Sequence, residues 1–497
     1  MLDVVIIGAG VSGVGAARYM KVNFPEQNFA ILEARKAVGG TWDLFRYPGI
    51  RSDSDMFTFG YRFKPWREAR AIADGPSILS YVNETVDEND LRNKIEFDSR
   101  VVAADWSSDE AAWTLTVQAD NGSKRAVKTR FIWSCTGYYR YDAGYTPQFE
   151  GVEDFKGRLV HPQMWPSDLD YAGKRVVVIG SGATAVTLVP SMAEKTAHIT
   201  MLQRSPTYMF ARPGTSAVAA FLRRVFPETV AYRMMRWWRI CFQNFLYKFA
   251  RHRPAKAREQ LIEETREKLK PGFDVDRHFS PTYNPWDQRI CYVPDDDLFN
   301  AINDGKASVV TEQIDRFVEN GVRLKNGDVL EADIVITATG LSLQVFGGAE
   351  LRVDGETIKT GEKLNYRGLM LEAVPNFVFI IGYINASWTL RVDLVADFMK
   401  RLFGHMKQTG ANVVTPVNPD PSIVKNESMF GLTSGYVKRA LDIMPKQGPD
   451  PWRHDHDYFK DVFAMRHAKI NDGVLQFNSV ATKRNETASG ETLAAAE

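Results

Sequence analysis

Three glycines near the start of the chain have the spacing of a loop that binds a dinucleotide. Gly8, Gly10 and Gly13 follow residues 2–7, an apolar stretch typical of a buried strand. In such a loop the first glycine permits a tight turn, the second lets the backbone approach a pyrophosphate, and the third allows close helix–strand packing. Free amides at the start of the following helix then bind phosphate oxygens. The sequence therefore predicts a phosphate site here, with Ser12 among its contacts.

An acidic residue completes this first site. Glu33 ends the second predicted strand, residues 29–32. It stands about twenty residues past the loop, where a carboxylate binds a ribose hydroxyl. Strand, glycines, helix and acid together predict a Rossmann-like domain. Its position at the start of the chain resembles the FAD-binding loops of flavoproteins that bind two dinucleotides.

A second glycine-rich loop follows another apolar stretch, residues 175–179. Gly180 and Gly182 begin a G-x-G-x-x-A pattern that ends at Ala185. After the next predicted strand, the acid typical of an NAD site is absent and Arg204 takes its place. A guanidinium at that point binds the 2′-phosphate that distinguishes NADP from NAD. We therefore predict NADPH as the reductant; the alternative is that Arg204 is an exposed loop cation.

Further cofactor contacts are predicted around the second loop. Residues 131–137 and 334–340 both end in Thr-Gly and resemble the strands that return each sheet to its nucleotide. Both nucleotide sites thus fit one α/β chain with two Rossmann-like domains. The additional predicted contacts are Ala183, Thr184, Ser205, Thr339 and Gly340.

The segment between the two loops contains a longer motif. Phe155, Gly157, His161 and Trp165 have the spacing F-x-G-x-x-x-H-x-x-x-W-P. This pattern resembles the fingerprint of the type I Baeyer–Villiger monooxygenases, which are class B flavoprotein monooxygenases. Two nucleotide loops alone predict only a flavoprotein that uses a nicotinamide, whereas this motif predicts what the reduced flavin does next.

A second motif of the same family lies earlier in the chain. Gly40, Thr41 and Trp42 are followed by Tyr-Pro-Gly at 47–49 and then by Asp53. By this resemblance, the residues of the glycine–threonine–tryptophan turn contact the cofactor. Two independent long motifs in one chain rarely arise by chance.

The chain is most similar to the ethionamide-activating branch of the family. Three segments carry this likeness: residues 46–56, 283–289 and 382–388. The resemblance extends from residue 1 to about residue 478.

The resemblance implies the reaction. Members of the family bind FAD tightly, reduce it with NADPH and use it to activate O2 as a flavin C4a-peroxide. Oxygen is then inserted beside the carbonyl of an apolar aliphatic or aryl ketone, which gives an ester or a lactone. Sulfoxidation is implied as a side activity, so the predicted partner is a small hydrophobic ketone or sulfide.

The resemblance also assigns the two predicted catalytic residues, Arg289 and Asp53. A fixed cation beside the reacting oxygen favours its anionic form and stabilises the charge of the adduct. Arginine suits this role because it stays charged and presents a rigid fork of donors, which Asp53 would orient. The alternatives are a structural arginine and, for Asp53, an N-cap of a helix at 56–58. Gln288 replaces a lysine frequent in relatives, which leaves a second cation near the nicotinamide open.

His161 invites assignment as a general base, but the motif lies on the link between the domains. The family uses this link structurally. We predict a hinge or cofactor-positioning role for His161, because one flavin must meet first the nicotinamide and then the substrate. Trp165 is predicted to pack at the same link.

A predicted helical insertion interrupts the second domain from about residue 211 to 279. Its residues 230–251 form a basic amphipathic helix that can lie weakly on an anionic membrane surface, wall an apolar substrate channel or pack on a sheet. The sequence leaves these three open, and Pro227 and Pro254 are predicted to bound the helix. Apolar residues at helical spacing are Met234, Met235, Trp238, Cys241, Phe242, Phe245 and Phe249. Basic residues predicted on other faces are Arg233, Arg236, Arg239, Lys248 and Arg251.

The predicted fold class is α/β, with FAD- and NADP-binding domains that are each built from two parts. The helical insertion separates the two parts of the NADP-binding domain. The predicted segments are 1–140 (FAD, first part), 141–207 (linker motif and NADP, first part), 208–289 (insertion), 290–341 (NADP, second part), 342–480 (FAD, second part) and 481–497 (disordered tail).

The composition limits the possible binding partners and the cellular compartment of the protein. Lys+Arg number 62 and Asp+Glu 61, so no net field favours nucleic acid. Cys135, Cys241 and Cys291 form no C-x-x-C pair, which argues against a metal site and a disulfide reductase and suits a reducing cytoplasm. A strand beginning at Leu2 leaves no room for a signal peptide, and no apolar run reaches membrane-spanning length. The sequence predicts a cytoplasmic enzyme of open oligomeric state.

Two other functions remain open. A flavin monooxygenase that oxygenates nitrogen or sulfur would contain both loops, and the G-Y-x-N context of Asn385 fits such an enzyme. A non-oxygenating NADPH-binding flavoprotein, acting as a redox sensor or oxidase, would also contain both loops. Comparing the rates of oxidation of ketones and sulfides would distinguish a heteroatom-oxygenating enzyme from a ketone-oxygenating one. Rapid substrate-dependent oxidation of NADPH would exclude a redox sensor.

Overall fold

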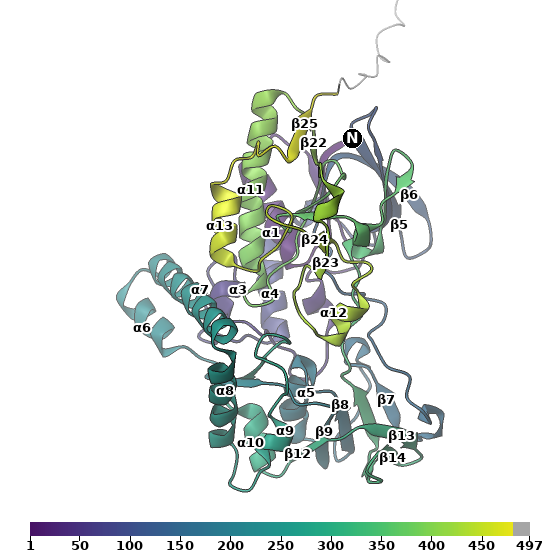
Figure 1. Ribbon diagram of the computed structural model, residues 1–497, viewed down its shortest axis with the longest axis vertical. Helices are drawn as coiled ribbons and strands as arrows, with labels where there is room; N and C mark the ends of the chain where they lie inside the picture. Colours follow the sequence, from purple (N-terminus) through teal and green to yellow (C-terminus); the bar gives the residue numbers. More distant parts are fainter. Residues whose placement is uncertain (481–497) are drawn as a thin grey trace, which may run out of the picture.

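The computed structural model describes residues 1–480, apart from the side chains of residues 425, 426 and 428. Two lobes, each built on a sheet, lie one above the other in Figure 1, and a pair of helices projects from the side between them. This arrangement confirms the predicted α/β class with a helical insertion. The predicted disordered tail, 481–497, lies outside the described residues.

The larger sheet has 11 strands and carries the first glycine-rich loop. Strand β1 (Leu2–Ile7) pairs in parallel with β2 (Phe29–Leu32) on one side and with β6 (Lys124–Ser134) on the other. The other strands are β3 (Ile95–Glu96), β4 (Arg100–Ser107), β5 (Ala112–Gln118), β17 (Glu350–Val353), β18 (Glu356–Thr357), β19 (Asn365–Tyr366), β20 (Met370–Leu371) and β21 (Phe377–Phe379).

Strand β1 is apolar because both of its faces are buried. Val4 and Ile6 lie in the core on the side of helix α1 (Val11–Asn23). Val5 and Ile7 lie in the core on the opposite side. A parallel strand covered on both faces requires such a continuous apolar run. Further helices of this lobe are α4 (Gly75–Glu88), α11 (Trp388–Thr409) and α13 (Tyr458–Arg466).

The smaller sheet has five parallel strands in the order β12-β9-β8-β16-β7 and carries the second glycine-rich loop. Helices α5 (Ala183–Ala193) and α10 (Asp297–Asn303) pack together on one of its faces. The strands are β7 (Arg158–Val160), β8 (Arg175–Ile179), β9 (His198–Gln203), β12 (Ala307–Thr311) and β16 (Ile334–Thr337). An antiparallel sheet of β13 (Ile314–Val318), β14 (Gly321–Leu324) and β15 (Val329–Glu331) packs on the other face.

Both sheets take their strands from two separate parts of the chain. The larger sheet uses residues 2–134 and 350–379, and the smaller sheet uses 158–203 and 307–337. This order of strands fits the proposed division of the chain, whose limits stay predictions. Shorter two-stranded sheets join β22 (Val413–Pro416) to β25 (Leu475–Asn478) and β23 (Lys425–Ser428) to β24 (Lys446–Gln447).

Four helices form the insertion. Pro227 precedes the long helix α7 (Glu228–His252) and Pro254 begins α8 (Pro254–Lys268), as the sequence predicts. No helix among residues 1–480 is both long and apolar enough to span a membrane. The remaining helices are α6 (Ala217–Val225) and α9 (Val275–His278), and the parallel pair β10 (Met209–Arg212) and β11 (Cys291–Pro294) closes the insertion.

The buried face of α7 differs from the predicted one. Arg236, predicted on a polar face, is only 6% exposed. It donates to the carbonyl oxygens of Phe57, Thr58 and Gly60 and forms an ion pair of 2.7 Å with Asp393. The prediction was wrong because helical spacing does not reveal a counter-charge 157 residues further along the chain. Arg236 therefore fixes the insertion to the lobe that contains the larger sheet.

We predict that Arg236→Ala destabilises the protein strongly. Removing one partner of a buried ion pair leaves the other charge unpaired, which costs about 3–5 kcal/mol. The matched control is Arg233→Ala on the exposed side of the same helix, which we expect to change stability by less than about 0.5 kcal/mol. Urea denaturation followed by far-UV circular dichroism measures both. Equal midpoints for the two variants would contradict the anchoring role of Arg236.

Candidate active site

A cavity of about 1800 Å³ lies between the two lobes. Pockets for single small ligands measure roughly 300–1000 Å³, so this one has room for more than one molecule. Both glycine-rich loops, the insertion and the 283–289 segment line it. The predicted cofactor and catalytic residues that line it are Gly8, Gly10, Ser12, Glu33, Gly40, Thr41, Trp42, Asp53, Gly180, Gly182, Ala183, Thr184, Arg204, Ser205, Arg289, Thr339 and Gly340.

The first glycine-rich loop has the geometry of a phosphate cradle. Gly8 has a φ of +100°, which favours glycine, and a Cβ on Gly13 would lie 1.8 Å from the Gly8 carbonyl oxygen. Gly13 thus lies behind the loop and lets α1 approach it. Gly10 precedes α1, and no side chain caps this helix. Gly10, Val11 and Ser12 line the cavity, so this uncapped end of α1 fits the pyrophosphate of a dinucleotide.

The second family motif packs against this loop. A Cβ on Gly40 would lie 3.2 Å from the Cα of Gly10, so the two backbones are in close contact. Thr41 and Trp42 begin the short helix α2 (Thr41–Leu44). The Thr41 hydroxyl lies 3.3 Å from the Tyr141 hydroxyl. The first glycine-rich loop and the motif at 40–53 therefore shape one end of the cavity together.

Glu33 holds the first loop in place. Its Oε2 accepts a hydrogen bond of 2.6 Å from the Ala9 amide, and its Oε1 accepts one from Arg35. Burial raises the pKa of Glu33, whereas these two backbone hydrogen bonds oppose the rise. The carboxylate also lines the cavity. Contact with a ribose stays a prediction for Glu33.

The second loop repeats the arrangement of the first. Gly180 has a φ of +139°, and a Cβ there would lie 2.3 Å from the Ala338 carbonyl oxygen. Gly182 precedes α5, and no side chain caps this helix either. A Cβ on Gly182 would meet nothing within 4 Å, so space for a ligand lies in front of the helix. The geometry fits a second pyrophosphate.

Residues around the second loop complete its wall. Arg204 follows β9 and is exposed beside the cavity. The Ser205 carbonyl oxygen accepts a hydrogen bond of 3.2 Å from Ser181 in the loop. The Thr339 hydroxyl donates to the Tyr145 carbonyl oxygen at 2.6 Å, and Gly340 has a φ of +103°. This Thr-Gly turn therefore connects the sheet with the linker between the lobes.

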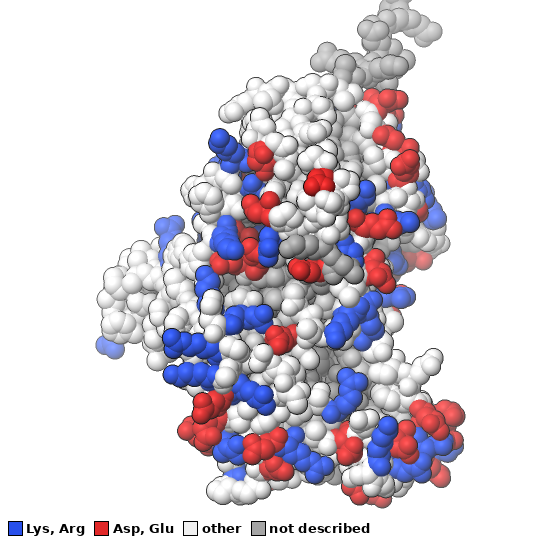
Figure 2. Space-filling view, viewed as in Figure 1, with Lys and Arg blue, Asp and Glu red and all other residues white. Residues whose placement is uncertain are grey.

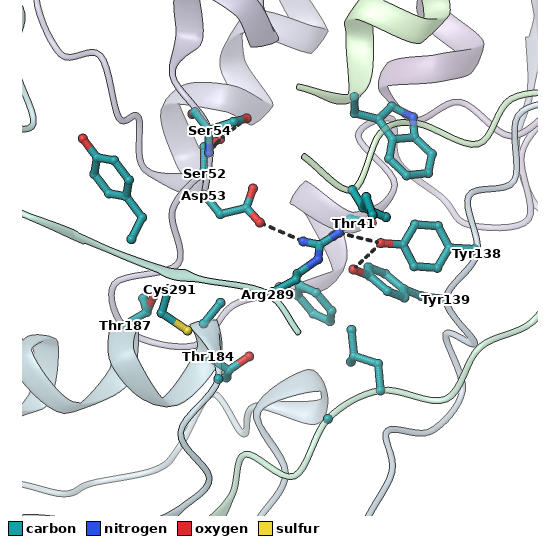
Figure 3. Close-up of a pocket in the computed structure, with 18 of the residues that line it drawn as sticks. Thr41, Ser52, Asp53, Ser54, Tyr138, Tyr139, Thr184, Thr187, Arg289 and Cys291 are labelled. Carbon is teal, nitrogen blue, oxygen red and sulfur yellow. Dashed lines mark hydrogen bonds and ion pairs between the residues drawn. The ribbon is translucent and has the colours of Figure 1, made fainter. Parts of the chain in front are cut away.

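Arg289 and Asp53 form an ion pair across the cavity. One terminal nitrogen of Arg289 lies 2.9 Å from the Asp53 carboxylate, and the other donates to the Tyr138 hydroxyl at 3.3 Å (Figure 3). Burial opposes the positive charge, but Tyr138, Tyr436 and Asp53 hold the pKa of Arg289 well above its usual value. Arg289 is therefore a fixed cation between the two nucleotide loops.

Tyr138 connects this cation with the first loop, and sequence reasoning missed it. Its ring stacks on Trp388 with centroids 5.3 Å apart, and Trp388 donates a hydrogen bond of 2.7 Å to Ser12 in α1. Tyr436, from α12 (Gly435–Arg439), also lines the cavity. The available signal was the position of Tyr138 directly after a Thr-Gly turn that returns to the nucleotide.

Asp53 is not a helix cap. The N-cap of α3 (Met56–Phe59) is Asp55, whose carboxylate accepts a hydrogen bond of 3.1 Å from the Thr58 amide. Gln243 of α7 also donates to Asp55 at 2.8 Å. This leaves Asp53 directed at Arg289, and the capping alternative is wrong.

The linker motif lies outside the cavity. Its central residues form β7, the edge strand beside β16, and Phe155 packs on Phe317 behind the sheet. Gly157 is required because a Cβ there would lie 2.5 Å from the Asp333 carbonyl oxygen. Trp165 packs, partly buried, against the core of the lobe that contains the smaller sheet. The motif therefore builds the edge of the smaller sheet.

His161 contacts the Thr-Gly turn at the end of β16. Its Nε2 lies 3.2 Å from the Gly340 carbonyl oxygen, and its Nδ1 accepts from the Gln163 amide at 3.2 Å. A Cβ on Gly144 would lie within 1.9 Å of the ring. Burial lowers the pKa of His161, which favours the neutral ring. These contacts support a positioning role.

Helix α7 presents three different faces. The core face packs on the lobe that contains the larger sheet, the cavity face lines the candidate active site, and the outer face is exposed. The core face comprises Ala231, Tyr232, Met235, Arg236 and Ile240. The cavity face comprises Trp238, Arg239, Phe242, Gln243, Leu246 and Phe249. The outer face comprises Val230, Met234, Trp237, Cys241 and Phe245.

The comparisons with known proteins give the family. The sequence profile described as FMO-like, flavin-binding monooxygenase-like, matches residues 72–347. The FAD-containing monooxygenase EthA of Mycobacterium tuberculosis (strain H37Rv) is 49% identical over 478 residues, which is 96% of this chain and 97% of that one. The probable FAD-binding monooxygenase AlmA of an Acinetobacter species is 48% identical over 480 residues, which is 96% of each chain. The chain therefore belongs to the flavin-binding monooxygenase-like family, and it is an FAD-containing monooxygenase.

Solved structures show the same fold. An oxidized steroid monooxygenase bound to NADP has a TM-score of 0.76 at 22% identity, over 96% of this chain and 99% of that one. An open structure of cyclohexanone monooxygenase has a TM-score of 0.70 at 21% identity, over 84% of this chain and 90% of that one. These similarities confirm the predicted architecture of two dinucleotide-binding domains with a helical insertion.

We predict that Gly13→Ala weakens FAD binding. Because the added Cβ would lie 1.8 Å from the Gly8 carbonyl oxygen, the loop must shift. Overpacking of this kind costs roughly 1–3 kcal/mol, or about fivefold to 150-fold in Kd. The matched control is Gly404→Ala in α11, where a Cβ meets nothing within 4 Å. FAD titration of the apoproteins checks this, and equal affinities in both variants would contradict the cradle.

We predict that Arg204→Ala raises the KM for NADPH and leaves the KM for NADH unchanged. Loss of a charged hydrogen bond to the 2′-phosphate raises the KM for NADPH by roughly tenfold to hundredfold. Arg277→Ala, an exposed arginine of α9 outside the cavity, is the control. Steady-state kinetics with both nucleotides measures the effect. Equal changes for NADPH and NADH would show that Arg204 does not recognise the 2′-phosphate.

Proposed function

We propose that this enzyme is a Baeyer–Villiger monooxygenase that converts apolar ketones to esters or lactones with NADPH and O2. In the balanced reaction, ketone, O2, NADPH and a proton give ester, NADP⁺ and water. One observation carries the proposal: the Arg289–Asp53 ion pair lies in the cavity that both nucleotide loops share. The two motifs of this family, at 40–53 and 155–166, support it.

Bound FAD would supply the transfer of electrons from NADPH to O2. Its pyrophosphate fits the uncapped start of α1, and that of NADPH fits the uncapped start of α5. Arg289 would donate hydrogen bonds to the oxygen that becomes negative when the carbonyl carbon is attacked. Asp53 and Tyr138 would hold the guanidinium in place, so that no reorganisation is needed during the reaction.

The wall of the cavity supports an apolar substrate. The cavity face of α7 supplies Trp238, Phe242, Leu246 and Phe249. Such a wall excludes water. This strengthens the electrostatic interactions of the Arg289 guanidinium and protects reactive oxygen from proton transfer. The proposed substrates are therefore small hydrophobic ketones, with sulfides as secondary substrates.

We propose the cytoplasm as the site of action. The three cysteines are all free among the residues that the structure describes, and Cys241 is exposed. A free exposed thiol suits a reducing compartment, where NADPH is also available.

Oxygenation of nitrogen or sulfur is the second candidate. Asn385 lines the cavity, and its amide donates to the His456 carbonyl oxygen at 3.0 Å. Its side-chain oxygen is buried and has no hydrogen-bond partner among residues 1–480. A larger kcat/KM for a thioether than for a ketone of equal length would favour this candidate.

We predict that Arg289→Ala keeps FAD and oxidises NADPH but loses ester formation by roughly 10²–10³-fold. Arg212→Ala, which removes another ion-paired arginine at the cavity wall, is the matched control. Ester formed per NADPH oxidised, measured by gas chromatography, reports the effect. An ester yield in Arg289→Ala equal to that of Arg212→Ala would refute the role of Arg289.

A further inference from the structure

Helices α6 and α7 form a projecting hairpin that presents an exposed apolar surface to solvent. This hairpin, at the left of Figure 2, is almost entirely white, with blue side chains only at its edges. Phe221 and Phe245 are 62% and 63% exposed, and Trp237 is 48% exposed. We call this surface the hairpin patch; its members are Phe221, Val225, Phe226, Val230, Met234, Trp237 and Phe245.

The hairpin patch faces outward, away from the cavity. None of its members lines the cavity, unlike Trp238 and Val218, whose exposed surface borders it. On α7, Val230, Met234 and Trp237 are three or four positions apart, and the exposed Cys241 continues this spacing to Phe245, so these residues form one stripe along the helix. The ring of Phe459 from α13 stacks on Trp237 with centroids 6.5 Å apart and extends the patch. A continuous apolar surface of this kind marks an interaction site.

Two arginines lie beside the patch without a counter-charge. Arg224 of α6 and Arg233 of α7 are exposed, and neither forms an ion pair with any residue between 1 and 480. Three other basic residues of α7 are paired: Arg236 with Asp393, Lys248 with Asp457 and Arg251 with Asp287. Arg239 lies at the cavity instead, over the ring of Trp238. The outer end of the hairpin therefore combines exposed aromatic rings with two exposed arginines that form no ion pair within residues 1–480.

We propose that the hairpin patch docks on an anionic lipid bilayer. Aromatic side chains then occupy the interfacial region, and Arg224 and Arg233 contact the headgroups. A projecting hairpin can enter a soft surface, and its charge is complementary to acidic lipids. A symmetric contact with a second copy would instead bring these arginines of both copies together, which is unfavourable.

This docking would also deliver substrate, and this part rests on the proposed function. Trp238 and Phe242 lie on the cavity face of the same helix whose outer face carries Trp237 and Phe245. Val218 of α6 borders the cavity as well. An apolar ketone dissolved in the bilayer would therefore enter the active site beside the hairpin without crossing water.

Vesicle co-sedimentation of the FAD-loaded protein tests the proposal. We expect binding to phosphatidylcholine vesicles that contain phosphatidylglycerol, weaker binding without it, and loss of the difference at high salt. The triple variant Phe221→Ser, Trp237→Ser, Phe245→Ser should bind at least about tenfold more weakly. Arg224→Gln with Arg233→Gln should abolish the preference for the acidic lipid.

The control is Val22→Ser with Val329→Ser, which removes two exposed apolar side chains away from the hairpin. It should bind vesicles as the native protein does. All variants should retain FAD and oxidise NADPH with a short, water-soluble ketone. The proposal fails if the native protein does not bind acidic vesicles, if the triple variant binds equally, or if its only change is loss of self-association in light scattering.

Vesicle binding requires no turnover, so the two proposals fail separately. If the protein binds acidic vesicles but forms no ester, the docking surface is supported and the proposed function is refuted. If it forms ester from a soluble ketone but does not bind vesicles, the proposed function is supported and the docking surface is refuted. For delivery, the triple variant should slow oxidation of a long-chain ketone held in vesicles and leave the short ketone unaffected; equal rates on both would exclude entry through the hairpin.

Discussion

The ion pair between Arg289 and Asp53 is the contact on which the account of the active site depends. Asp53 is the last residue of the motif that packs on the first glycine-rich loop, whereas Arg289 precedes β11 beside the NADP lobe. The pair therefore joins the two nucleotide-binding halves at the cavity. Helices α1 and α5 both start at the cavity without a side-chain cap, so each half has a helix end that fits a phosphate, and the fixed cation lies between the two.

Several other contacts maintain this arrangement. Trp388 connects Ser12 with Tyr138, so the first loop and the cation share one chain of contacts. His161 secures the Thr-Gly turn of the smaller sheet from the linker side. Arg236 fixes the long helix of the insertion, which keeps the aromatic wall of the cavity in place. The motif of the linker thus acts at a distance from the chemistry.

Local patterns allowed much of this structure to be predicted from the sequence. Each glycine-rich loop, with the strand before it and the helix after it, is specified within about twenty residues, and Gly8, Gly13 and Gly180 have the geometry that such loops require. The contact of Arg289 with Asp53 spans 236 positions and was accessible only through family motifs. Tyr138 and the burial of Arg236 were missed, because tertiary partners from distant segments determine them and no periodic pattern records such partners.

The most direct test of the central claim is to follow isotopically labelled O2 during turnover of a long-chain 2-ketone with NADPH. Baeyer–Villiger oxygenation would give an ester that contains one labelled oxygen for each NADPH consumed, with the second labelled atom released as water. NADPH consumption that yields only labelled hydrogen peroxide, with the ketone unchanged, would contradict the assignment of this chain as a ketone-oxygenating enzyme.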